Sequence, residues 1–419
     1  MKLRISYGKK VERSEDEQII FALCCLMFIP SINYFLNSVL QIGLSIHLSF
    51  LTPLAYIFMA GASGLVLYKY VVTRLSFVIL LFMTIFATAI SYLLYPEIRS
   101  SIYNSPVDLV YSSANKLVFF CIPALTGTAC LRDHNGLFER MRNWGRLTVI
   151  LGAFTFLFVF FLAGKKLNYM VYSYFMLLSI CVCYEHAIIT HTVLDLSIAI
   201  LGSACIVMCG ARGAVVSLAL YFVVRVLARL RKRETRSNIM KAICAFVCIL
   251  AVVILNKQFL QIGIALCDYL GINSRFLLML SSGELMQDSA RSYIAQAIVN
   301  GLAWNPLGYG LFSDRFVTGT YGYSRYVYSH NIFLELLCDF GIVGGSILIV
   351  ALLWRLAKTI RALEKRPERS LLYVLLPYGF FQLLFSSSFL ENTLFFMILA
   401  MIFCVNWGNE SDMQNGDLA

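Results

Sequence analysis

Three side chains in the second half of the chain have types and positions that suit chemistry at a membrane surface. Arg212 stands between two apolar runs, Arg291 lies on a predicted amphipathic helix, and His330 directly precedes another apolar run. A guanidinium binds phosphate with two parallel hydrogen bonds and stays cationic near lipid. Histidine, whose ordinary pKa is about 6.5, can accept a proton at neutral pH. These residue types therefore indicate anion binding and proton transfer.

Both arginines also have a simpler interpretation. Arg291 follows Asp288 by three residues and Gln287 by four, which is the spacing of a weak surface pair on a helix. Arg212 could extend toward lipid headgroups from its short hairpin. The charge pattern of the chain works against that role, however, and a charge at this depth is a functional hypothesis by default.

The histidine and two lysines leave similar alternatives open. His330 could be a bystander beside a helix that Ser329 or Asn331 caps. Lys165 and Lys166 occupy a very short predicted hairpin, where they could simply hold lipid phosphates.

The elements that position these residues are predicted to be membrane helices. Of the 419 residues, 59% are hydrophobic and 14% charged, against roughly 45–50% and 25% in soluble domains. The mean hydropathy is +0.76. The apolar residues form runs of about twenty, the length of a bilayer-crossing helix, and lipid offers no partner for unpaired backbone. The basic residues that give the net charge of +11 lie mostly between these runs. They therefore indicate how the chain is oriented in the membrane and not nucleic-acid binding.

About twelve spans are expected in an all-α polytopic membrane protein, with residues 1–419 as a single integral membrane domain. The first run follows a basic segment and lacks a small-residue cleavage site, so it is interpreted as an anchor. The predicted spans are 19–37, 48–68, 75–95, 109–130, 147–163, 168–184, 193–209, 213–228, 242–255, 332–354, 371–387 and 389–406.

The distribution of basic residues predicts the orientation. With a cytoplasmic N-terminus, the inner segments hold 23 of the 34 Lys and Arg residues and the outer segments 10. This bias follows the positive-inside rule and also places the C-terminus in the cytoplasm. The longest outer segment is then 256–331, which carries Arg291 and His330. We expect this loop to hold part of the active site.

Within the long outer loop, the sequence predicts a helix over about 284–303 that ends at a turn. Ser281 and Glu284 have the spacing of a capping box, and apolar residues then recur with helical period. Residues 304–310 follow with turn chemistry. Most of the thirteen cysteines lie in apolar runs, and the outer acids form no Asp-X-Asp pair. Neither a metal nor a cofactor is expected.

Four motifs in order resemble the O-antigen polymerase and O-antigen ligase superfamily over roughly residues 205–350. They are Gly-Ala-Arg212-Gly-Ala, Asp-Ser-Ala-Arg291-Ser-Tyr293, Asn-Pro306-Leu-Gly308-Tyr-Gly310 and Ser-His330-Asn331-Ile-Phe-Leu-Glu335, the last followed by Gly341 and Gly344. The hairpin with Lys165 and Lys166 is similar to the basic loop of that family, with Lys where Arg is expected. The resemblance implies a glycosyltransferase of GT-C-like architecture in the bacterial inner membrane.

The resemblance also implies roles for individual residues. The donor would be an oligosaccharide on undecaprenyl pyrophosphate, with Arg212 and Arg291 stabilising the departing pyrophosphate and His330 acting as base. Lys165, Lys166, Tyr293, Asn331 and Glu335 would bind substrate. The lipid bilayer is the implied environment, and a chain-length regulator and a flippase are implied pathway partners.

Two activities of the superfamily and one of another class remain to be weighed. A repeat-unit polymerase is favoured over a ligase to lipid A core by the Ser-His-Asn form of the His330 motif and by Ser386, Ser387 and Ser388 in the last hairpin. A transporter or flippase also fits twelve spans. Internal repeats, which are typical of transporters, are not found, and the one large outer loop favours an enzyme.

Overall fold

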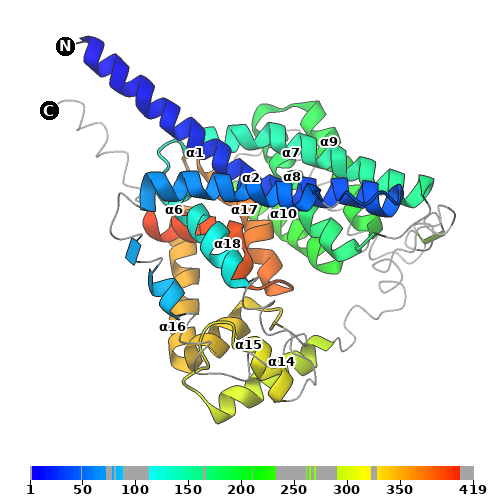
Figure 1. The fold of residues 1–419 in the computed structure, drawn as a ribbon, viewed down its shortest axis with the longest axis vertical. Coiled ribbons are helices and arrows are strands. Elements are labelled where there is room, and N and C mark those ends of the chain that lie inside the picture. The colour runs from blue at the N-terminus through cyan, green and yellow to red at the C-terminus, as the bar shows by residue number, and fades with distance from the viewer. Residues whose placement is uncertain are drawn as a thin grey trace.

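The computed structural model is helical throughout the part of the chain that it describes (Figure 1). It describes residues 2–48, 50–71, 78–79, 82–87, 113–163, 167–209, 211–232, 261, 264–265, 269, 290–321 and 328–405. The α-helices are α1 (Lys2–Asn37), α2 (Leu51–Val66), α6 (Ile122–Cys130), α7 (His134–Leu157), α8 (Tyr169–Thr190), α9 (Val193–Cys209), α10 (Arg212–Lys232), α14 (Ala290–Trp304), α15 (Asp314–Thr320), α16 (Ile332–Ala362), α17 (Arg369–Leu376) and α18 (Thr393–Leu399).

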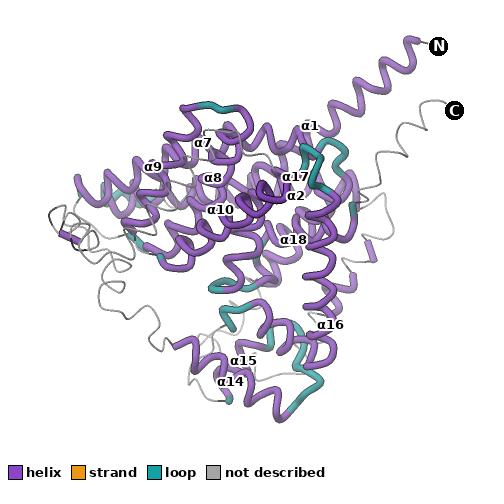
Figure 2. Tube along the Cα trace, turned by 180° about the vertical axis from the view of Figure 1, so that it is seen from behind, coloured by secondary structure: helices purple, strands orange, loops and turns teal. Residues whose placement is uncertain are grey.

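Short π-helical and 3-10 turns extend several of these helices. The π-helical turns are η1 (Ser38–Gly43), η2 (Leu67–Val71), η3 (Leu117–Cys121), η4 (Phe158–Leu162), η6 (Pro377–Phe381) and η9 (Ala400–Cys404), and the 3-10 turns are η7 (Gln382–Leu384) and η8 (Phe389–Glu391). Figure 2 shows the helices from behind, in purple, with the described loops and turns in teal.

The chain is a helical membrane protein, and four of its described helices are long and apolar enough to span a bilayer. They are Glu15–Gly43, Leu51–Lys69, Tyr169–Thr190 and Ile332–Ala362. Helices also occur at most of the other predicted spans, whereas 242–255 and most of 75–95 lie outside the described residues. The count of twelve spans and the GT-C-like architecture stay predictions.

The described helix ends meet in two groups that agree with the predicted alternation of spans. At the predicted outer side, the side chain of Asn37 at the end of α1 donates to Thr52 at the start of α2, 3.2 Å away. The Tyr34 hydroxyl donates to the carbonyl of Asn168 before α8. At the predicted inner side, Arg225 of α10 forms an ion pair with Glu185 of α8. These contacts agree with the predicted antiparallel course of α1 with α2 and with α8, and with the parallel course of α8 and α10.

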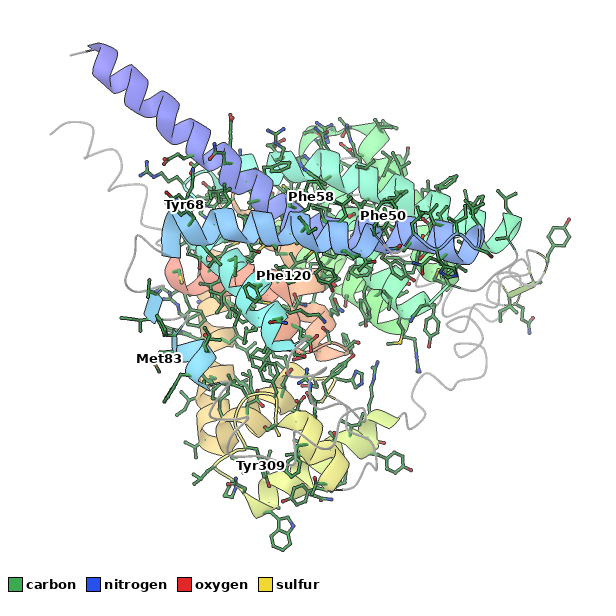
Figure 3. The ribbon with its side chains drawn as sticks, viewed as in Figure 1. Phe50, Phe58, Tyr68, Met83, Phe120 and Tyr309 are labelled. Carbon is green, nitrogen blue, oxygen red and sulfur yellow. The ribbon has the colours of Figure 1, made fainter. Side chains whose placement is uncertain are left out.

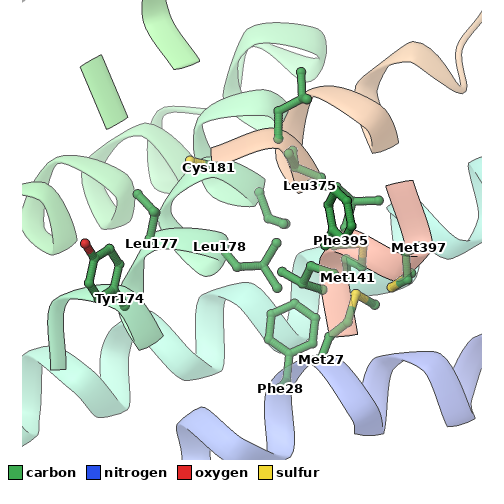
Figure 4. Close-up of a cluster of buried hydrophobic side chains, with 14 of the residues drawn as sticks. Met27, Phe28, Met141, Tyr174, Leu177, Leu178, Cys181, Leu375, Phe395 and Met397 are labelled. Carbon is green, nitrogen blue, oxygen red and sulfur yellow. The ribbon is translucent and has the colours of Figure 1, made fainter. Parts of the chain in front are cut away.

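The bundle has one large apolar core centred on α8. Figure 4 shows part of it, where Leu177, Leu178 and Cys181 of α8 lie among Met27 and Phe28 of α1 and residues of α7, α17 and α18. The face of α2 that points away from the bundle is not part of this core, because Phe50 and Phe58 on this side are each 58% exposed (Figure 3). Apolar side chains in such numbers face lipid more readily than water.

A smaller lobe forms around α14, α15 and the first part of α16 (Figure 1). It has its own apolar cluster, to which Ile298 of α14, Val317 of α15 and Cys338 of α16 contribute together with Tyr309. Figure 3 places Tyr309 well inside this lobe, away from the bundle. The predicted helix 284–303 is confirmed over residues 290–303, and its first residues lie outside the described part.

The predicted span 332–354 lies within α16, and this helix is broken at Gly341. Gly341 has φ +75° and ψ 174°, which interrupts the helix. The turn at 306–310 packs into the break: the N–H of Tyr309 donates to the carbonyl of Cys338 (2.9 Å), and that of Ile342 to Pro306 (2.8 Å). A Cβ on Gly341 would lie 2.4 Å from the Leu307 carbonyl carbon, so only glycine fits there.

Candidate active site

Asn331 shapes the segment that presents His330. Its side-chain oxygen accepts hydrogen bonds from the N–H groups of Phe333 (2.9 Å) and Leu334 (3.3 Å), which caps α16. Its amide nitrogen donates to the carbonyl of Leu384 at 3.5 Å. The capping role that sequence offered as the simpler alternative therefore belongs to Asn331. A part in substrate binding stays a prediction for this residue.

His330 lies immediately before the cap in a left-handed backbone conformation, with φ +56°. Its ring contacts that of Tyr328, with centroids 4.1 Å apart. Its Nδ1 atom is buried and has no hydrogen-bond partner among the described residues. This nitrogen is not engaged by another described residue, and the left-handed backbone helps to fix the direction of the ring.

The electrostatic surroundings of His330 correct the ordinary pKa that sequence assigned to it. Burial, the positive charge of Arg291 and an opposing effect of Asp314 together lower its pKa from 6.5 to about 4. Burial acts most strongly because it disfavours the charged imidazolium. His330 is therefore neutral at pH 7, and Arg291 lies close enough to act on it.

Tyr174 of α8 lies near Arg291 and beside the start of α10. Its hydroxyl forms a hydrogen bond with the side chain of Ser386 and lies within electrostatic range of Arg291. The same hydroxyl lies 2.0 Å from where a Cβ on Gly213 would be, at the start of α10 beside Arg212. Tyr174 thus lies at the start of the helix that carries Arg212 and within range of the exposed guanidinium of Arg291, whose charge also acts on His330.

A buried ion network, which sequence analysis missed, supports the segment before His330. Asp314 accepts a hydrogen bond from the N–H of Ser329 (2.7 Å) and another from the Arg315 guanidinium (2.9 Å). Arg315, 1% exposed, also donates to Glu391 at 2.8 Å. Burial lowers the pKa of Arg315, but Asp314, Glu391, Glu335 and Asp339 outweigh it and raise the pKa above its usual range.

The same network reaches the last outer hairpin, residues 385–392, and the start of the fourth predicted span. Glu391 accepts from Lys116 (2.8 Å) and from Ser113. Glu335, fully buried on α16, accepts from the Ser388 hydroxyl and from the N–H of Phe389 (3.1 Å). The lobe and the bundle are therefore joined by charge at this point. A sequence signal existed, since Asp314 and Arg315 stand as adjacent opposite charges between Phe312 and Phe316.

The remaining predicted site residues lie in different surroundings. Tyr293 of α14 is 61% exposed, so it is accessible to a ligand from solution. Lys165 and Lys166 lie outside the described residues, as does Asp288. Their roles stay predictions. Within the described ranges, no three His, Cys, Asp or Glu side chains are grouped as metal ligands would be.

Residues 197–349 match the O-antigen ligase family. The match runs from α9 through the break in α16, and it contains Arg212, Arg291, Arg315 and His330. The family resemblance predicted from the sequence is confirmed for this stretch, which is consistent with the O-antigen polymerase and ligase superfamily. In coarse terms this supports a glycosyltransferase role in polysaccharide assembly. Neither the curated proteins nor the solved structures gave a match.

Proposed function

We propose that this protein is an O-antigen polymerase of the bacterial inner membrane, acting at the periplasmic face. It would transfer an oligosaccharide from undecaprenyl pyrophosphate onto another lipid-linked repeat unit, with inversion at the anomeric carbon. The observation that carries the proposal is that Arg291 acts on both His330 and Tyr174, while Tyr174 lies at the start of the helix that carries Arg212, inside the stretch that matches the family.

The reaction asks two things of these residues. The acceptor hydroxyl forms a new bond to the anomeric carbon while the bond from that carbon to the pyrophosphate oxygen breaks, and the pyrophosphate leaves with the electron pair. Arg212 and Arg291 would stabilise its negative charge by bidentate hydrogen bonds. The hydroxyl proton would pass to His330. Positive charge from arginine serves this chemistry, so a metal-independent reaction is part of the proposal.

The low pKa of free His330 suits this sequence of events. A donor pyrophosphate beside Arg291 cancels the positive charge that helps to keep the pKa near 4. Binding of the donor therefore raises the basicity of His330 when the proton must be taken up. Before the donor binds, the base is neutral and ready to accept.

A ligase remains the second candidate, because the matching family carries that description. We prefer the polymerase because the motif has the form Ser-His330-Asn331 and because the last outer hairpin carries Ser386, Ser387 and Ser388. Two of those serines are engaged, Ser386 with Tyr174 and Ser388 with Glu335. Deleting the gene and resolving lipopolysaccharide on a gel tests the choice. A band with a single repeat unit indicates polymerase loss, and bare core indicates ligase loss.

A flippase and a chain-length regulator are the partners proposed for the same pathway. If the protein were instead a flippase, purified protein in liposomes would move lipid-linked sugar across the bilayer without forming a glycosidic bond. We expect bond formation between two lipid-linked repeats, detected by mass spectrometry of the extracted lipid products.

A further inference from the structure

A cavity of about 550 Å³ lies in the bundle, apart from the arginines and His330. Its lining residues come from α1, η1, α2, η3, α8, η6 and α18 and from the outer hairpin 385–392. Small-molecule sites typically occupy roughly 300–1,000 Å³. Figure 3 shows Phe120, one of its lining residues, in the bundle close to the lobe.

The two ends of the cavity differ in chemistry. The end that lies deeper in the bundle is apolar, with Leu26, Met27 and Met59 among its lining residues. The outer end is lined by Asn37, Gln41, Thr52, Lys116 and Glu391. From Asn37 to Leu26, α1 rises about 16 Å at 1.5 Å per residue, about half of the roughly 30 Å hydrocarbon core. This shape fits a hydrocarbon chain whose polar end remains at the outer surface.

Helix α2 separates this cavity from the surrounding lipid. Met59 points inward and is 7% exposed, whereas Ile57 on the same helix is 67% exposed and does not line the cavity. A chain in the cavity is therefore held by protein on several sides and differs from a lipid that merely coats the bundle. Tyr56, which lines the cavity and is also half exposed, marks the side facing the membrane.

The outer hairpin lies between the cavity and the candidate active site. Ser386 interacts with Tyr174 on the side of the arginines, and Ser387 and Glu391 line the cavity. Lys116 at the mouth already forms an ion pair with Glu391, which leaves little positive charge to stabilise a departing pyrophosphate. The site with Arg212 and Arg291 suits the donor lipid, because the donor's pyrophosphate departs during the reaction and needs positive charge. The cavity suits the acceptor lipid, whose bond to its pyrophosphate is not broken.

We propose that this cavity receives the first isoprene units of the polyprenyl chain that carries the acceptor repeat unit. This inference rests on the proposed polymerase function and assigns the second substrate of that reaction to a site. Donor and acceptor then approach the hairpin from opposite sides. One chain fits a cavity of this size, whereas lipid A, the acceptor of a ligase, carries several acyl chains.

The binding test uses geranylgeranyl phosphate with a photoreactive group at its hydrocarbon end. After irradiation of the full-length protein in detergent, mass spectrometry should find the label on peptides of α1, α2 or α18. Ala55→Trp fills the cavity and should reduce labelling at least tenfold, and Ile57→Trp, on the lipid-facing side of α2, should leave it unchanged. Thr52→Trp at the exposed mouth replaces Ala55→Trp if that variant does not fold.

Two outcomes of the binding test overturn the assignment. One is labelling that is equal in Ala55→Trp and Ile57→Trp. The other is displacement of the label by phosphatidylglycerol as effectively as by unlabelled geranylgeranyl phosphate, which would make the cavity an ordinary phospholipid site. Because this test measures binding alone, it can succeed even if the protein proves to lack polymerase activity.

The activity test separates acceptor from donor. With a lipid-linked donor throughout, Ala55→Trp should lower the rate with a lipid-linked acceptor about tenfold or more. It should leave the rate unchanged with a lipid-free oligosaccharide acceptor. Equal loss with both acceptors would assign the cavity to the donor and overturn the proposal, and so would an unchanged rate with both.

Discussion

Two buried ion clusters lie at opposite ends of the helix bundle, and they are built differently. The inner cluster pairs Glu185 with Arg225 at 3.0 Å and adds hydrogen bonds from Tyr221 (2.9 Å) and Ser370 (2.8 Å). The outer cluster gathers four carboxylates around Arg315: those of Asp314, Glu335, Asp339 and Glu391. The Ser313 hydroxyl donates to Asp339, and Lys116 pairs with Glu391.

The difference lies in charge balance and in what each cluster contacts. The inner cluster matches one acid with one base and joins three helices. Among the described residues, the outer cluster has more acids than bases, and it holds the backbone next to His330 and one end of the cavity. Buried ion pairs add little net stability, but losing one partner costs about 3–5 kcal/mol. We therefore expect the inner cluster to serve folding and the outer cluster to serve the site.

Replacing histidines at the two ends should give the largest contrast. His330→Ala should lower kcat by roughly 10²–10⁴, because general-base catalysis is typically worth that factor. His191→Ala is the matched control, since His191 also has a left-handed backbone (φ +56°) at the end of α8 and is exposed at the inner side. Rates of repeat-unit transfer by purified protein test this. Parent activity of His330→Ala across pH 6 to 8 would exclude His330 as the base and make Glu335 or Asp288 the next residue to test.

Arginine substitutions at the outer and inner sides should give the next largest difference in activity. Arg291→Lys and Arg212→Lys keep the charge but lose the bidentate fork, so each should slow transfer roughly tenfold to a hundredfold, the value of about 1.5–3 kcal/mol for a charged hydrogen bond. Arg140→Lys, exposed on α7 at the inner side, is the control. If Arg291→Lys and Arg291→Ala both retained full activity, Arg291 would have no part in the site.

Removing one acid from each cluster tests the division between folding and function. Asp314→Ala should lower kcat about tenfold, because the Ser329 N–H loses its acceptor and the segment before His330 loosens. Glu185→Ala should destabilise the protein by about 3–5 kcal/mol and leave the kcat of the folded fraction unchanged. Thermal unfolding and kcat are measured on both variants. The reverse pattern would contradict the comparison.

The pH dependence gives the smallest and most specific effect. The acid limb of kcat/KM, which reports the free enzyme, should fall near pH 4 to 5, because the pKa of His330 is lowered to about 4. The acid limb of kcat, which reports the enzyme with donor bound, should lie at higher pH, because bound pyrophosphate cancels the charge of Arg291 and so raises the pKa of His330. Arg291→Ala should raise the kcat/KM limb toward 6.5. Identical limbs for both parameters would contradict the proposed effect of the donor.

The same shift makes a prediction for folding. The folded state keeps His330 neutral between about pH 4 and 6.5, whereas the unfolded chain binds a proton there. The contribution of His330 to stability is therefore fully present above pH 6.5 and is lost as the pH falls toward 4. His330→Gln, which does not titrate, should show a flatter decline of the unfolding temperature over that interval.

Features that depend on residues close together in the sequence, such as helix caps and apolar helices, could be predicted from the sequence. The cap at Asn331, the helix around 290–303 and the helices at 168–184 and 193–209 follow from side-chain spacing and apolar length. The break at Gly341 could not be predicted in this way, because its cause is the Pro306 carbonyl, more than thirty residues earlier in the chain. Arg315 escaped prediction for a similar reason, since its partner Glu391 comes from the last hairpin.

The turn seated in the break of α16 closes a loop in the chain much as a cross-link would. Hydrogen bonds from Tyr309, Gly310 and Ile342 fix both of its ends, and the stretch between them contains Arg315 and His330. Closing a loop removes conformational entropy from every residue inside it. That loss is incurred once, during folding, and not again each time a glycan arrives. The backbone hydrogen bonds at this break thus preorganise the proposed general base His330. Substitutions of Gly308 or Gly341 should therefore lower turnover although neither residue contacts a substrate.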